Sequence, residues 1–140
     1  MLFTINRATW RCGDEGVNKH GTGSSLLLNA DGFMCCLGQM SSELGCPHAA
    51  LLRIGTPETI FNVQPSEEVE KLLPKFKGVF LDVEGNDSEL TNQAMRINDN
   101  IELTHQQRED ALIKLFTKYN HEIVFTRRYT DESISSNPII

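Results

Sequence analysis

Residues 26–38 have the sequence Leu26-Leu27-Leu28-Asn29-Ala30-Asp31-Gly32-Phe33-Met34-Cys35-Cys36-Leu37-Gly38. Together with the two serines before it, the short apolar run that ends at Asn29 is typical of a buried strand. Asp31 and Gly32 form a turn dipeptide, because both readily adopt the positive φ of tight turns. Apolar residues then recur at helical spacing as far as Leu44, before Gly45 as a natural C-cap. The stretch predicts a strand at 24–29 and a helix at 33–44.

Gly38 lies inside this predicted helix. A glycine there costs about 1 kcal/mol relative to alanine. An unfavourable residue at such a position indicates that another part of the backbone approaches closely. We therefore expect a tight contact at Gly38.

Further elements are predicted on both sides of this segment. Strands are expected at residues 2–5, 78–83 and 122–126, with short extended pieces at 51–54 and 59–63. Helices are expected at 65–73 and 88–96, and a third begins at the capping box Thr104-His105-Gln106-Gln107. The pattern predicts a small α+β domain over residues 1–126, with a short mixed or antiparallel sheet and about three to four helices. Residues 127–140 are polar and predict a flexible tail.

Composition limits the classes of function. The chain has 140 residues and a formal net charge of −6, from 13 Lys and Arg against 19 Asp and Glu. An acidic surface disfavours broad contact with nucleic acid, although a local basic pocket can still hold a small anion. No segment has the roughly 20 apolar residues of a membrane span, and no signal peptide is recognisable. Four cysteines in such a chain predict reduced thiols and a cytoplasmic protein.

No complete catalytic or metal signature occurs. Cys46-Pro47-His48 lacks the paired knuckle spacing of a zinc site. The acidic stretch from Asp82 fails the calcium-loop pattern, because Asp87 stands at the position that requires glycine and Gln93 at the one that requires glutamate. A cysteine nucleophile needs a nearby histidine that the sequence does not place. We predict no metal, no cofactor and no catalytic residue, and we expect the cysteines to be small core residues.

The glycine-rich segment between Asn6 and Gly23 is the first candidate binding region. Its length is typical of a functional loop or of a mobile one. Cationic side chains and an aromatic ring in it can bind phosphates and stack on a base. The alternatives are a surface loop without a ligand and a tryptophan that belongs to the core. The candidate residues are Arg7, Trp10, Arg11, Lys19 and His20.

A second candidate region lies on the predicted helix at 88–96 and just after it. Asn92 and Arg96 are four residues apart, so both can face one anion from the same side of the helix. Asn98 and Asp99 follow as a polar edge, and polar loop residues often line sites. The alternatives are a solvated helix surface and a helix-ending turn, since Asn and Asp bond their own backbone.

The block Leu27-Leu28-Asn29-x-x-Gly32-x-Met34-Cys35-Cys36-Leu37-Gly38, with Trp10-x-Cys12-Gly13 before it, resembles a family of small, uncharacterised phage and prophage proteins. The likeness continues at Ile97-Asn98-Asp99 and at Arg108-Glu109 with Leu115-Phe116, and it covers roughly residues 7–126. It implies a host-takeover or counter-defence factor that acts in the host cytoplasm.

Within that context, the sequence predicts a non-enzymatic binding protein that sequesters a nucleotide signalling molecule, in a pocket that can lie at a homo-oligomer interface. One alternative is an inhibitor that masks a host protein. The other is a small nucleotide-modifying hydrolase. Nucleic acid in bulk and membranes are not expected as partners.

Overall fold

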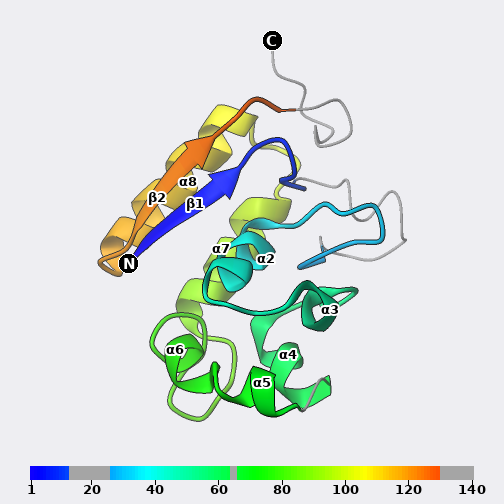
Figure 1. The fold of residues 1–140 in the computed structure, drawn as a ribbon. Coiled ribbons are helices and arrows are strands. Elements are labelled where there is room, and N and C mark those ends of the chain that lie inside the picture. The colour runs from blue at the N-terminus through cyan, green and yellow to red at the C-terminus, as the bar shows by residue number, and fades with distance from the viewer. Residues whose placement is uncertain (13–25, 64–65, 130–140) are drawn as a thin grey trace.

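The computed structural model describes residues 1–12, 26–63 and 66–129. Strands from opposite ends of this chain, β1 (Leu2–Asn6) and β2 (Glu122–Thr126), lie side by side (Figure 1). They pair in parallel, with Leu2 opposite Glu122 and Asn6 opposite Thr126. The α+β class is confirmed, but the sheet is parallel and not mixed or antiparallel. Parallel strands need a long crossover, which the intervening helical chain supplies here.

The segment between the strands is helical to a greater extent than the sequence predicts. More helices form than the expected three to four, and several have a single turn. In the described residues they are α2 (Cys36–Glu43), α3 (His48–Leu51), α4 (Pro57–Val63), α5 (Glu67–Glu70), α6 (Leu73–Lys77), α7 (Glu89–Asp99) and α8 (His105–Lys118).

Three strands or extended pieces predicted from short apolar runs are wrong. Residues 59–63 belong to α4, and residues 78–83 follow α6 with turns and a single bridge residue, Leu81. Of residues 51–54, Leu51 ends α3, and Leu52 forms an isolated bridge with Leu28. Buried helical turns and buried strands have the same apolar composition over so few residues, so composition does not separate them.

The close contact predicted at Gly38 is confirmed. A Cβ at Gly38 would lie 1.8 Å from the carbonyl oxygen of Leu27. Leu27 and Leu28 therefore pass directly against α2, and both are buried. This contact fixes the segment that precedes the turn at Asp31 and Gly32 onto the helix that follows it. The described part of the strand predicted at 24–29 forms no strand, because Leu28 makes only an isolated bridge with Leu52.

The core lies between the sheet and the longer helices. β1 packs against α2, β2 packs against α8, and α7 lies between α2 and α8. Phe3 and Ile5 turn from β1 into this core, where the Phe3 ring centroid is 5.7 Å from that of Phe80 and 6.2 Å from that of Phe116. Among the described residues, no helix has the length and apolar character needed to cross a membrane.

Candidate functional site

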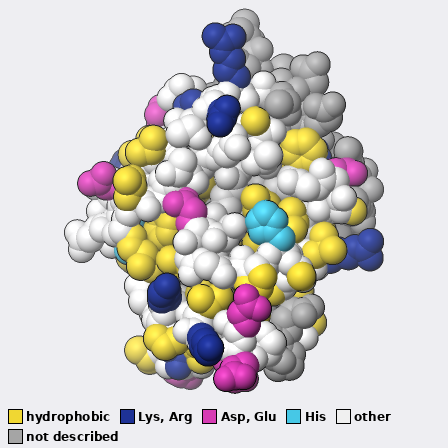
Figure 2. Space-filling model, in the orientation of Figure 1, with side chains coloured by type: hydrophobic (Ala, Val, Ile, Leu, Met, Phe, Trp, Pro, Cys, Tyr) yellow, Lys and Arg dark blue, Asp and Glu magenta, His cyan; other side chains and the backbone are white. Residues whose placement is uncertain are grey.

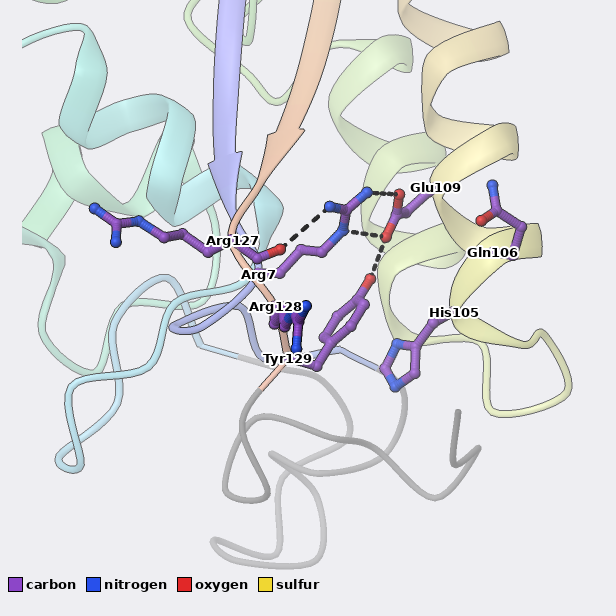
Figure 3. A pocket seen from close by; sticks show the side chains of 7 residues that line it. All are labelled: Arg7, His105, Gln106, Glu109, Arg127, Arg128 and Tyr129. Atoms are coloured by element: carbon purple, nitrogen blue, oxygen red, sulfur yellow. Dashed lines mark hydrogen bonds and ion pairs between the residues drawn. The ribbon is translucent and has the colours of Figure 1, made fainter. Parts of the chain in front are cut away.

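A cavity of about 450 Å³ lies at the carboxyl ends of the two strands. Arg7 follows β1 directly, residues 127–129 follow β2, and the first turns of α8 supply the remaining wall (Figure 3). Ligands commonly bind outside the carboxyl ends of parallel strands. The lining residues are Arg7, His105, Gln106, Glu109, Arg127, Arg128 and Tyr129.

Arg7, Glu109 and Tyr129 form the fixed part of this lining. The Arg7 guanidinium donates two hydrogen bonds to the Glu109 carboxylate, at 2.8 Å from Nε and 2.7 Å from Nη2. The Tyr129 hydroxyl donates to the same carboxylate, and Arg7 Nη1 donates to the carbonyl oxygen of Arg127 at 3.2 Å. The hydrogen bond to Glu109 raises the pKa of Arg7. Three segments distant in sequence are thus held together by one carboxylate.

His105 is held in one tautomer behind Tyr129. Its Nδ1 lies 3.4 Å from Arg108 Nη1 and 3.5 Å from the Cys12 sulfur. A guanidinium can only donate, so Nδ1 accepts and Nε2 carries the proton. Burial, with a smaller effect from the charge of Arg108, lowers the pKa of His105 to about 4. The imidazole is therefore neutral near pH 7, and its Nε2 is buried without a hydrogen-bond partner among the described residues.

The charge of the lining is positive. Arg7 and Glu109 neutralise each other in the ion pair, whereas neither Arg127 nor Arg128 forms an ion pair with a described residue. Figure 3 shows the Arg127 side chain extending away from Glu109. The Arg7 guanidinium carbon lies 5.9 Å from the centre of the Tyr129 ring, and Arg128 is a further cation of the lining. The first turn of α8 adds the positive end of a 14-residue helix. In a chain of net charge −6, this pocket favours an anion.

The predicted binding residues of the glycine-rich segment lie in different environments. Arg7 lines the cavity, as described. Trp10 is fully buried, with its ring 5.3 Å from Phe125 and 6.0 Å from Tyr129, so it is a core residue in this structure. Arg11 is buried, with its guanidinium carbon 4.5 Å from the centre of the Phe33 ring. Lys19 and His20 lie outside the described residues.

The predicted polar edge on α7 divides into two parts. Asn92, Arg96 and Asp99 line a second, open cavity of about 340 Å³ together with Met95. Asn98 is instead buried: its Oδ1 accepts from Trp10 Nε1 at 2.7 Å and from the backbone N–H of Cys36 at 3.0 Å. The structure therefore does not bring Arg7 and the α7 residues into one cavity.

Most of the cavity lining was missed by the sequence prediction. The capping box marks the start of α8 and is confirmed, but nothing in the pattern directs His105, Gln106 and Glu109 towards Arg7. For Arg127, Arg128 and Tyr129 the sequence predicts only a flexible tail. The carboxyl-end rule for parallel strands would have found both groups, had parallel pairing been predicted.

The four cysteines are buried free thiols. Burial raises the pKa of Cys12 and of Cys35 to about 12, and that of Cys46 to about 11. Within the described residues, no three potential ligands from His, Cys, Asp and Glu are grouped to hold a metal ion. The chain matches no protein-family model, no curated protein and no solved structure.

Proposed function

We propose that this protein binds a small anionic ligand of the nucleotide class in the cavity beside Tyr129. The observation that supports this is the arginine-rich lining at the carboxyl ends of β1 and β2. Arg128 and the first turn of α8 favour a phosphate, and the Tyr129 ring, which packs on the buried His105, provides a planar wall for a base. The volume of about 450 Å³ lies in the range of small-molecule sites.

The proposed role is binding without chemistry. The Glu109 carboxylate is occupied by Arg7 and Tyr129, which leaves it poorly placed as a general base. The Cys12 thiol beside His105 is fully buried, and burial raises its pKa to about 12, so it is a poor nucleophile. The resemblance to phage proteins stays a prediction from the sequence, and with it we propose a counter-defence role in which the ligand is a host signalling nucleotide held out of reach of its receptor.

A thermal-shift experiment tests the proposal. Cyclic, linear and ADP-ribose-type nucleotides are added to the protein in turn. A nucleotide that binds, present at a hundred times its Kd, stabilises the folded state by about 2.7 kcal/mol. Arg128→Ala removes a cation of the lining and is expected to abolish most of the shift. Lys75 on α6 is an exposed cation outside the cavity lining, so Lys75→Ala is the matched control and is expected to retain the thermal shift.

Two outcomes would overturn the proposal. No shift across the panel excludes nucleotide binding under these conditions, and an equal shift in Arg128→Ala places the ligand elsewhere. Mass spectrometry of the ligand released on heating separates binding from turnover. An intact nucleotide supports sequestration, whereas a new mass favours the hydrolase alternative.

A further inference from the structure

The backbone N–H and C=O groups of successive residues in β2 point alternately to the two edges of the strand. The N–H of Glu122 donates to the carbonyl oxygen of Met1 at 2.8 Å, and the carbonyl oxygen of Thr126 accepts from the N–H of Arg7 at 2.8 Å. These residues therefore face β1. By strand alternation, Ile123 and Phe125 direct their N–H and C=O groups to the opposite edge. No described residue is hydrogen-bonded to the backbone of β2 at that edge.

The corresponding outer edge of β1 is closed by side chains of α2. The N–H of Thr4 donates to Glu43 Oε1 at 2.6 Å, and the N–H of Asn6 donates to Gln39 Oε1 at 2.9 Å. The fold thus satisfies one outer edge of its two-stranded sheet with dedicated polar groups. An outer edge without such groups is a template for pairing with another strand.

The outer face of the same sheet carries apolar side chains. Val124 is 46% exposed at the centre of β2, and Leu2 is 58% exposed on β1. Figure 2 shows hydrophobic side chains over the region of the two strands, interspersed with charged ones. Addition of a further strand beside β2 removes part of this exposed apolar surface from water, which is favourable.

We propose that β2 pairs antiparallel with β2 of a second copy of this chain, about a two-fold axis at Val124. This register places Ile123 opposite Phe125 of the partner subunit, so the outward N–H and C=O groups of both residues are satisfied. The Val124 side chains of the two subunits then lie next to each other on the exposed face of the sheet. The two sheets become one continuous four-stranded sheet.

Charge complementarity favours a second copy as the occupant. In this register Glu122 of the partner subunit lies opposite Thr126, immediately before Arg127 and Arg128. A glutamate therefore lies one position from Arg127 at each end of the pairing, and like charges do not face each other among the paired residues. A closed two-fold contact of this kind is isologous, which is the commonest form of homo-oligomer.

Light scattering after size exclusion, over a wide range of chain concentration, tests the proposal. The wild type is expected to approach twice the chain mass of 15.7 kDa as the concentration rises. Val124→Lys places two cations against each other at the two-fold axis and stays at 15.7 kDa. Val83→Lys is the matched control at another exposed valine, in a turn outside the sheet, and behaves as the wild type. Circular dichroism checks that both variants are folded.

Amide hydrogen exchange provides the second measurement. In the wild-type dimer, the amides of Ile123 and Phe125 exchange more slowly than in monomeric Val124→Lys, whereas the amide of Glu122 is protected in both. A wild type that remains monomeric overturns the proposal. So does a dimer in which the Ile123 and Phe125 amides gain no protection, because its contact then lies on another surface. Neither readout depends on a ligand, so the nucleotide proposal stands or fails separately.

Discussion

Asn98 connects three segments through a single buried amide. Besides accepting from Trp10 and from the Cys36 backbone, its Nδ2 donates to the carbonyl oxygen of Arg11 at 3.1 Å. The sequence predicts a polar residue at a ligand edge, because an asparagine after a helix is normally exposed. Periodicity does not reveal that the amide is enclosed by α2 and the segment around Trp10. At this scale, side-chain partners from other segments decide the role.

Replacement of Asn98 is therefore expected to be costly. Asn98→Ala leaves the indole N–H of Trp10 and the backbone N–H of Cys36 unpaired in the core, and each unpaired donor costs about 1–3 kcal/mol. We predict a loss of about 3 kcal/mol in the free energy of unfolding. Urea denaturation followed by the fluorescence of the one tryptophan of the chain measures it.

Asn92→Ala is the matched control on the same helix, where the side chain is only partly buried. Its unfolding free energy should change by less than about 0.5 kcal/mol, as for most surface substitutions. Equal effects of the two substitutions would contradict the role assigned to Asn98.

At the scale of elements, local chemistry predicted some boundaries well. The capping box at Thr104 and Gln107 fixes the start of α8, and β2 has the bounds expected from its alternating residues. Helix α7 extends to Asp99, three residues beyond the expected end. The failures concern short apolar runs without caps, such as residues 59–63, where packing against neighbours determines the conformation.

Gly38 allows the packing of α2 to be tested. In an exposed helix Gly→Ala stabilises by about 1 kcal/mol. Here the added Cβ would meet the Leu27 carbonyl oxygen at 1.8 Å, so Gly38→Ala is expected to lower the free energy of unfolding by about 1–3 kcal/mol. Thermal or urea denaturation shows directly whether Gly38→Ala lowers or raises the free energy of unfolding.

Gly55→Ala serves as the comparison, because a Cβ there meets nothing within 4 Å and the glycine does not have a positive φ. It should leave stability unchanged or raise it by about 0.4–1 kcal/mol through the unfolded state. If Gly38→Ala is also stabilising, the close approach of α2 to residue 27 is wrong.

At the scale of the whole molecule, the parallel pairing of the two chain ends creates the candidate site. Arg7 and Tyr129 are far apart in sequence and meet at Glu109 only because β1 and β2 run in the same direction. The sequence predicted both strands but not their relative direction, which depends on the path of the intervening helices. The sequence singles out Arg7 as a candidate, whereas its partner Glu109 and the other walls of the cavity depend on the topology.

The stability of the whole molecule is expected to decrease between pH 6.5 and 4. Burial and the neighbouring Arg108 lower the pKa of His105 to about 4, whereas a histidine in the unfolded chain has a pKa near 6.5. Between these values the unfolded state binds a proton that the folded state does not, so stability falls as the pH falls. One pKa unit corresponds to about 1.4 kcal/mol, which gives a loss of roughly 2–3 kcal/mol from this residue.

His105→Asn separates this contribution from the rest of the acid response. Asparagine retains an acceptor for Arg108 but does not titrate, so urea denaturation from pH 7 to 4 should show a flatter profile than the wild type. Some dependence of the unfolding free energy on pH remains in this variant, because burial and the N-terminal charge also lower the pKa of His121. His48→Asn at an exposed position on α3 is the control and is expected to retain the wild-type slope. If His105→Asn keeps the full slope, the imidazole is not the neutral, buried group that the contact with Arg108 requires.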